Sequence, residues 1–73
     1  MKKLIAKIET PNAKSFIHVY ELNNGEGYVV EIKFLGRYEV FDYTHENHAL
    51  WKFENGVSYF KDTFPIVEES IMI

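Results

Sequence analysis

The sequence predicts a small, mainly β fold: an antiparallel meander, or a partly closed barrel, of about five to seven short strands. Runs rich in β-branched and aromatic residues alternate with Asn, Gly and Pro, which is typical of antiparallel sheets. The chain of 73 residues contains no cysteine, so neither disulfides nor a thiolate zinc site can supplement its core. Hydrophobic residues make up 47% of the chain, which is enough for one core. We therefore expect a single domain over residues 1–73.

The first predicted strand spans residues 2–9 and ends at the turn sequence Thr-Pro-Asn. Residues 15–22 and 28–35 then form a hairpin around Asn-Asn-Gly-Glu-Gly, in which Asn and Gly tolerate positive φ angles. We expect Leu22 to pair with Tyr28. The same register gives three further pairs that share the predicted core face: Tyr20–Val30, His18–Ile32 and Phe16–Phe34.

A further strand is predicted over residues 37–44, after a tight turn. Tyr38 and Val40 face one side of this strand, whereas Phe41 and Tyr43 face the other. Large apolar or aromatic residues on both sides indicate a sheet that is covered on both faces or that curls toward a barrel.

Residues 44–60 admit two interpretations. The Asn55-Gly56 pair is typical of a type I′ hairpin turn, and we favour this hairpin because it separates apolar from polar residues along both arms. In the alternative, Thr44 caps a helix at about residues 45–55. The fold then becomes α+β, an antiparallel sheet with one helix on a face.

The last residues of the sequence, Ile71, Met72 and Ile73, are all apolar. Chain ends normally fray, but an apolar end gains from burial. We therefore expect this tail to dock, either on this domain or on a second chain. An unprotected strand edge could also pair two chains, and homo-oligomer formation by either route is therefore an expectation.

Asp42, His45 and His48 are spaced three residues apart and form the strongest metal-ligating pattern in the chain. Zinc requires three or four convergent ligands, and no fourth is evident, so we favour a solvated connection over a metal site. His18 lies on the predicted core face, where we expect it to be hydrogen-bonded to the backbone. The sequence contains no phosphate-binding glycine loop and no nucleophile elbow. We expect neither enzymatic activity nor a cofactor.

The net charge of −3 argues against general binding of nucleic acid, which relies on a basic surface. Small size and surplus aromatic residues favour instead a non-catalytic module that binds a larger protein and acts by occupying its surface. Accessory or inhibitor proteins of phages and mobile elements have this general character. The contact residues that we expect are Arg37, Tyr38, Phe41, Tyr43 and Trp51.

A second hypothesis is binding of single-stranded nucleic acid. The segment GYVVEIKF, residues 27–34, resembles the aromatic strand with which RNA-recognition and cold-shock domains stack bases. The resemblance implies that Tyr28 and Phe34 contact bases and that Lys33 supplies positive charge. Val30 stands where the usual second aromatic residue of that strand would be. Together with the negative net charge, this departure places the hypothesis second.

No stretch of the sequence approaches the roughly 18 consecutive apolar residues of a membrane span. Near the start, the apolar run of residues 4–6 is shorter than the roughly 7 residues that a secretory segment requires. We therefore expect a cytoplasmic protein that has no membrane partner.

Overall fold

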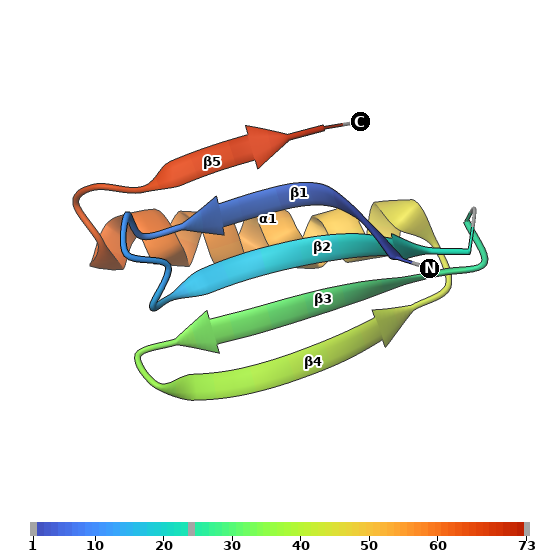
Figure 1. The fold of residues 1–73 in the computed structure, drawn as a ribbon, viewed down its shortest axis with the longest axis horizontal. Helices are drawn as coiled ribbons and strands as arrows, with labels where there is room; N and C mark the ends of the chain where they lie inside the picture. Colours follow the sequence, from blue (N-terminus) through green and yellow to red (C-terminus); the bar gives the residue numbers. More distant parts are fainter. Residues whose placement is uncertain (1, 24, 73) are drawn as a thin grey trace.

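The computed structural model describes residues 2–23 and 25–72. They form one five-stranded antiparallel sheet with a helix packed on one of its faces (Figure 1). The elements are β1 (Lys2–Glu9), β2 (Phe16–Leu22), β3 (Gly27–Phe34), β4 (Arg37–Tyr43), α1 (Glu46–Thr63) and β5 (Glu68–Ile71). This antiparallel sheet confirms the predicted fold class, with the helix of the α+β alternative.

The strand order is β4-β3-β2-β1-β5, so the first four strands form a meander and β5 returns to the outside of β1. The sheet is open, with β4 and β5 at its two edges, rather than closed into a barrel. In Figure 1 the helix runs behind the sheet, across the middle strands. One face of the sheet is therefore covered, and the opposite face is not.

The core lies between the covered face and α1. Strand residues that alternate toward the helix, among them Val19 and Val30, are fully buried, as are Phe53 and Phe60 of the helix. β1 contains a bulge between Leu4 and Ala6, which lets two consecutive residues of this strand enter the core.

The hairpin predicted at Asn55-Gly56 is wrong, because α1 runs without a break from Glu46 to Thr63. The decisive pattern is a helical stripe that extends past the Asn-Gly pair, formed by Ala49, Phe53, Val57 and Phe60. Gly56 has a packing role within this stripe, since a Cβ atom there would lie 2.7 Å from Cδ1 of Ile17 on β2. Glycine thus permits the helix to lie close to the sheet.

The ends of α1 also differ from the prediction. The residue before the helix is His45, not Thr44, and it makes no side-chain capping bond. At the other end, Phe64 has an extended backbone, as expected for a residue that precedes Pro65. Proline, rather than glycine, therefore marks where this helix stops.

The predicted register between β2 and β3 is wrong by one residue, because Leu22 pairs with Gly27 and not with Tyr28. The loop is short: the backbone N–H groups of Gly25 and Glu26 both donate to the carbonyl oxygen of Leu22, at 3.0 Å. Asn23 adopts a φ of 44° in this tight turn. The shift moves the predicted core residues of β2 to the uncovered face. These residues are Phe16, His18 and Tyr20.

The tail docks on this domain through β5. Ile71 pairs with Ala6 of β1, and the N–H of Met72 donates to the carbonyl oxygen of Ile5 at 2.8 Å. Ile73 lies outside the described residues. Within residues 2–23 and 25–72, no helix has both the length and the apolar character that crossing a membrane requires.

Candidate functional site

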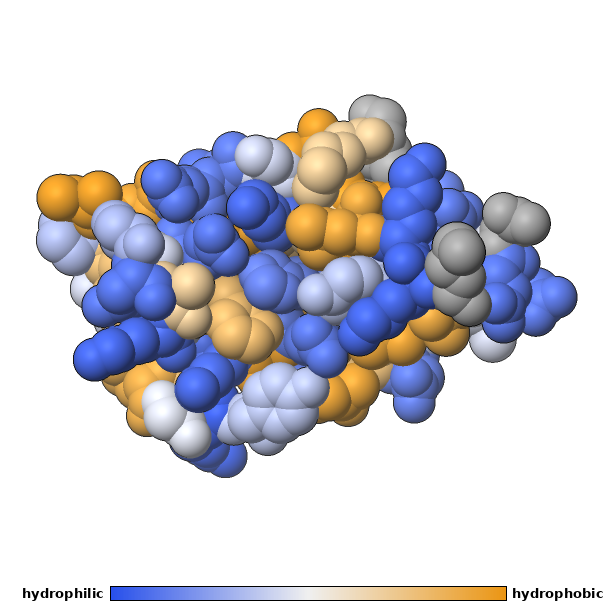
Figure 2. All heavy atoms as spheres, in the orientation of Figure 1, coloured by the Kyte–Doolittle hydropathy of each residue, from blue (hydrophilic) through white to orange (hydrophobic). Residues whose placement is uncertain are grey.

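The uncovered face of the sheet is the candidate site. Alternation along the strands directs to it an apolar and aromatic set of residues, which we call the open-face set. The open-face set comprises Leu4, Phe16, Tyr20, Leu22, Val29, Tyr38 and Val40. Figure 2 looks onto this face and shows apolar side chains interspersed with hydrophilic ones.

Three rings stand in a row along β2 at the middle of this face. Phe16 and His18 are stacked, with ring centroids 4.2 Å apart and planes inclined by 17°. His18 meets Tyr20 edge-on at 6.0 Å. Because residues two apart on a strand share a face, this row is a direct consequence of the sequence Phe-Ile-His-Val-Tyr.

A chain of hydrogen bonds joins the row to β1. Nε2 of His18 lies 3.2 Å from Oε2 of Glu9, and Nδ1 of His18 lies 3.3 Å from the hydroxyl oxygen of Tyr20. The Glu9 carboxylate can only accept, so Nε2–H of His18 is the donor of the first bond, and the second joins Nδ1 to the Tyr20 hydroxyl. The bond from His18 lowers the pKa of Glu9 below its usual value, and the nearby Lys7 ammonium acts in the same direction.

His18 is half-buried on the uncovered face and not on the core face, and its partners are the Glu9 carboxylate and the Tyr20 hydroxyl rather than the backbone that was predicted. The prediction missed Glu9 because the incorrect register turned His18 toward the core. In the structure, Glu9 pairs with Phe16 and Lys7 pairs with His18, so the carboxylate lies diagonally across from the imidazole.

A carboxylate, an imidazole and a hydroxyl in series are also the parts of a general-base relay. Here, burial raises the pKa of Tyr20, and the charge of Glu31 raises it further, so the phenolate is harder to form than in a free tyrosine. The Nζ atom of Lys2 lies 4.3 Å from the centre of the Tyr20 ring. These contacts hold the Tyr20 ring in place on the uncovered face.

Tyr38 of β4 is fixed in a similar way. Its hydroxyl donates to Oε2 of Glu31 at 2.9 Å, and this bond to a carboxylate raises the pKa of Tyr38. The bond turns the Tyr38 side chain inward over β3. Aromatic rings on β2 and β4 are thus both held at this face by acidic partners on neighbouring strands.

The structure disperses the five residues expected to contact a protein partner. Tyr38 lies on the uncovered face. Phe41 and Tyr43 face the helix side of β4, where both pack against the core and Nζ of Lys52 lies 4.3 Å from the centre of the Phe41 ring. Arg37 is exposed at the start of β4. Trp51 is 65% exposed on α1. Because Tyr38 lies on the sheet face opposite Phe41 and Tyr43, the five do not form one surface.

The residues of the nucleic-acid hypothesis are also divided. Tyr28 and Phe34 face the helix, and the Phe34 ring packs edge-on against Tyr59, with ring centroids 5.6 Å apart. Lys33 points to the opposite face, because alternate residues of β3 face opposite ways. The two aromatic rings and the lysine therefore have no common surface.

Asp42, His45 and His48 lie where β4 ends and α1 begins. The rings of His45 and His48 meet edge-on at 5.3 Å. Across the described residues, no group of three or more His, Asp or Glu side chains is arranged to hold a metal ion.

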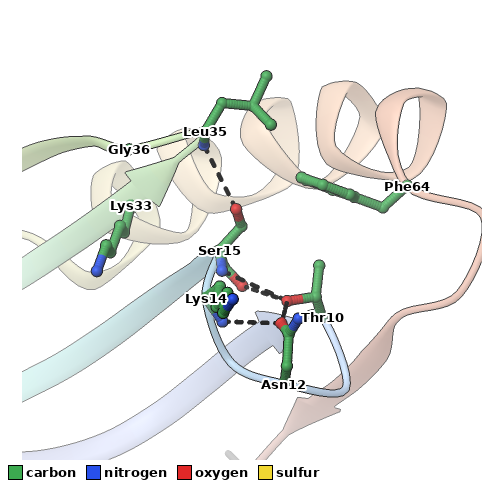
Figure 3. Close-up of a pocket in the computed structure, with 8 residues that line it drawn as sticks. All are labelled: Thr10, Asn12, Lys14, Ser15, Lys33, Leu35, Gly36 and Phe64. Carbon is green, nitrogen blue, oxygen red and sulfur yellow. Dashed lines mark hydrogen bonds between the residues drawn. The ribbon is translucent and has the colours of Figure 1, made fainter.

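A hollow of about 610 Å³ lies at the end of the sheet where the β1–β2 and β3–β4 loops meet the end of α1 (Figure 3). Several of its polar groups are bonded to one another: Asn12 Oδ1 accepts from the Thr10 hydroxyl at 2.7 Å, and Ser15 Oγ accepts from the Leu35 N–H at 3.4 Å. Figure 3 shows this polar cluster on one side and Phe64 on the other. These bonds explain the shape of the loops.

Comparison of the chain with protein-family models, curated proteins and solved structures gave no match. Function must therefore be inferred from the residues of this chain. The uncovered face is the strongest basis for that inference, because it presents aromatic side chains whose positions are fixed by named partners.

Proposed function

We propose that the protein is a non-catalytic module that binds a larger protein in the cytoplasm and acts by occupying its surface. The observation that supports this proposal is the open-face set, which presents apolar and aromatic side chains on the side of the sheet opposite α1. The helix already completes the core on the other side, so the fold does not require apolar residues here. Aromatic and aliphatic side chains at a sheet surface are typical of protein interfaces.

The rings of this face are suited to act as anchors. The His18 ring stacks on Phe16 and is hydrogen-bonded to the Tyr20 hydroxyl, and the Glu31 carboxylate accepts a hydrogen bond from the Tyr38 hydroxyl. A side chain that is already held in one position loses little conformational entropy when a partner binds. Tyrosine is also prominent among the residues that contribute most to interface energies.

The charges on this face favour a protein over a nucleic acid. Basic side chains alternate with acidic ones instead of forming a stripe. The residues concerned are Lys2, Lys7 and Lys33, together with Glu9, Glu31 and Asp42. A nucleic-acid surface would need a continuous basic track. A surface with charges of both signs fits a protein partner that also carries both signs. Accessory or inhibitor proteins of phages and mobile elements would act by blocking the surface of such a partner.

The test compares two variants with a matched control. Tyr38→Ala removes a ring and Val29→Lys adds a charge on the uncovered face, whereas Tyr59→Ala removes an exposed tyrosine from α1. The exposed fractions are 55% for Tyr38 and 68% for Tyr59. Each tagged chain is used to capture proteins from lysate of the source cell, and captured proteins are identified by mass spectrometry.

We expect one protein to be captured by the wild type and by Tyr59→Ala, and lost with Tyr38→Ala and Val29→Lys. Circular dichroism spectra must show that all variants keep the fold. Equal capture by all four chains would contradict the proposal. A nucleic-acid signal that weakens steeply with salt, with no protein, would support the second hypothesis instead.

A further inference from the structure

The two edges of the sheet differ in how well they are protected against pairing. β5 is four residues long and carries Glu68 and Glu69, and short charged edge strands resist pairing. β4 is seven residues long and keeps an unbroken register with β3 along its whole length. It contains no proline and no lysine, and its three charged residues, Arg37, Glu39 and Asp42, are of both signs, whereas those of β5 are all acidic.

The turn before β4 determines which of its backbone N–H and C=O groups point away from β3. Leu35 and Gly36 form a two-residue turn with φ angles of 51° and 87°, and Phe34 pairs with Arg37 on either side of it. In such a hairpin the two flanking residues exchange backbone hydrogen bonds, and every second residue does the same. Three residues of β4 therefore direct their N–H and C=O groups away from β3: Tyr38, Val40 and Asp42.

We propose that two copies of this chain pair along β4, antiparallel and centred on Val40. In this register Val40 of one copy faces Val40 of the other, and Tyr38 faces Asp42. On the helix side, Glu39 faces Phe41 and Arg37 faces Tyr43. All seven residues of each strand are paired, and every outward backbone group finds a partner.

The side-chain pairs favour this register. Val40 meets Val40 at the two-fold axis, Tyr38 faces Asp42 and Arg37 faces Tyr43, so no two like charges are directly opposite each other. A shift that centred the pair on Glu39 would place two glutamates directly opposite each other, and opposed like charges destabilise a sheet. The strand is therefore complementary to itself, which is the condition for a two-fold symmetric interface.

Nothing in the described residues obstructs the edge. α1 packs over β2, over β3 and, less closely, over the helix side of β4, and in Figure 1 it lies away from the outer edge of β4. The Tyr38 side chain is held inward by Glu31, and Val40 is 48% exposed. The inference is independent of the proposed function, although pairing would join two uncovered faces into one continuous surface.

The test uses opposite charges at the centre of the pair. Val40→Lys and Val40→Glu each place two like charges across the two-fold axis, and a mixture of the two variants pairs opposite charges. By sedimentation velocity at increasing concentration, we expect the wild type to approach twice the 8.6 kDa of one chain. Each variant should stay at the mass of one chain, and the mixture should regain the mass of two. Val29→Lys, on the same face but inside the sheet, should dimerise like the wild type.

Amide hydrogen exchange of the wild type supplies a second measurement that needs no variant. The N–H groups of Tyr38, Val40 and Asp42 should exchange rapidly in dilute solution and become protected as concentration rises. A wild type that keeps the mass of one chain at every concentration would overturn the proposal. So would dimers of both charged variants, or a mixture that fails to associate while the circular dichroism of each variant is native. Because Val29→Lys disrupts the proposed partner surface alone, failure of one proposal is distinguishable from failure of the other.

Discussion

The Glu9 carboxylate receives a hydrogen bond from His18 and lies 3.4 Å from Nζ of Lys7. Its pKa in the folded state is therefore lower than the usual 4.5. A lowered pKa means that Glu9 contributes its full stabilisation above the unfolded-state pKa and loses it as the pH falls through the folded-state pKa. We expect Glu9→Gln to lower the free energy of unfolding at neutral pH by about 1 kcal/mol, and to flatten its decline below the unfolded-state pKa.

Chemical denaturation of both proteins across this pH range measures the effect. Glu26→Gln, at an exposed loop position, is the control and should follow the wild type at each pH. If Glu9→Gln and the wild type lose stability in parallel as the pH falls, the bond between Glu9 and His18 does not stabilise the fold.

Leu35 adopts a left-handed backbone conformation, with a φ of 51°. Its side chain is 66% exposed, so burial does not compensate for this conformation. Leucine is strained in this region by about 1 to 2 kcal/mol, whereas asparagine followed by glycine is preferred in a two-residue hairpin turn. We expect Leu35→Asn to raise the free energy of unfolding by about 1 kcal/mol. Thermal or chemical denaturation measures this change.

Leu35→Ala separates the backbone from the side chain. Alanine removes the exposed apolar group but keeps the Cβ atom that causes the strain, so its stability should be close to that of the wild type. A gain equal to that of the asparagine variant would show that exposure of leucine, and not its backbone, was responsible.

Among the structural elements, α1 shows how local turn signals can mislead. Asn-Gly between apolar runs strongly indicates a hairpin, but the same segment carries Ala49, Phe53, Val57 and Phe60 at helical spacing. The stripe prevails because it buries large side chains against the sheet, which outweighs the unfavourable helix propensity of one glycine. Extending the helical pattern beyond Gly56 would have revealed this from the sequence.

Close contact between α1 and β2 depends on Gly56. Alanine there gains about 1 kcal/mol of helix propensity. Its Cβ atom, however, would lie 2.7 Å from Cδ1 of Ile17, so the side chain must move within a packed core. We expect Gly56→Ala to lower the free energy of unfolding by about 1 kcal/mol on balance. In an Ile17→Val background, which lacks the Cδ1 methyl group, the same change should become stabilising.

A double-mutant cycle of the four proteins by chemical denaturation isolates this contact. Ser58→Ala, an exposed position of the same helix, should have the same effect in both backgrounds. If the effects of Gly56→Ala and Ile17→Val on the free energy of unfolding are additive, the helix and β2 are not in close contact at this point.

At the scale of the whole molecule, the antiparallel sheet could be predicted because its strands and turns have local signatures. Four strands fall close to the expected ranges, and the turn before β4 forms where it was expected. The choice of covered face could not be predicted in this way. A one-residue shift in the β2–β3 register reverses every side chain of a strand, and only the position of the helix determines which side is the core.

The residues of the candidate site could be predicted only in part, because the covered face was not predicted. The strand pattern left the facing of Tyr38 open, although we expected it to contact a partner, and it lies on the uncovered face. Phe16 and Tyr20 were assigned to the core, since their apolar character alone resembles that of buried residues. Glu9 joins them through a contact between two strands, which no spacing along one strand could indicate. Sites formed across strands require a correct register first.

The strand order also has a kinetic consequence. β1 to β4 each pair with the next strand in the sequence, whereas β5 pairs with β1, which lies at the other end of the sequence. Closing such a distant contact has a larger entropic cost and is slower than forming a hairpin. Until Glu68–Ile71 pair with β1, its outer edge is bare, so a partly folded chain exposes a pairing edge that the folded sheet covers.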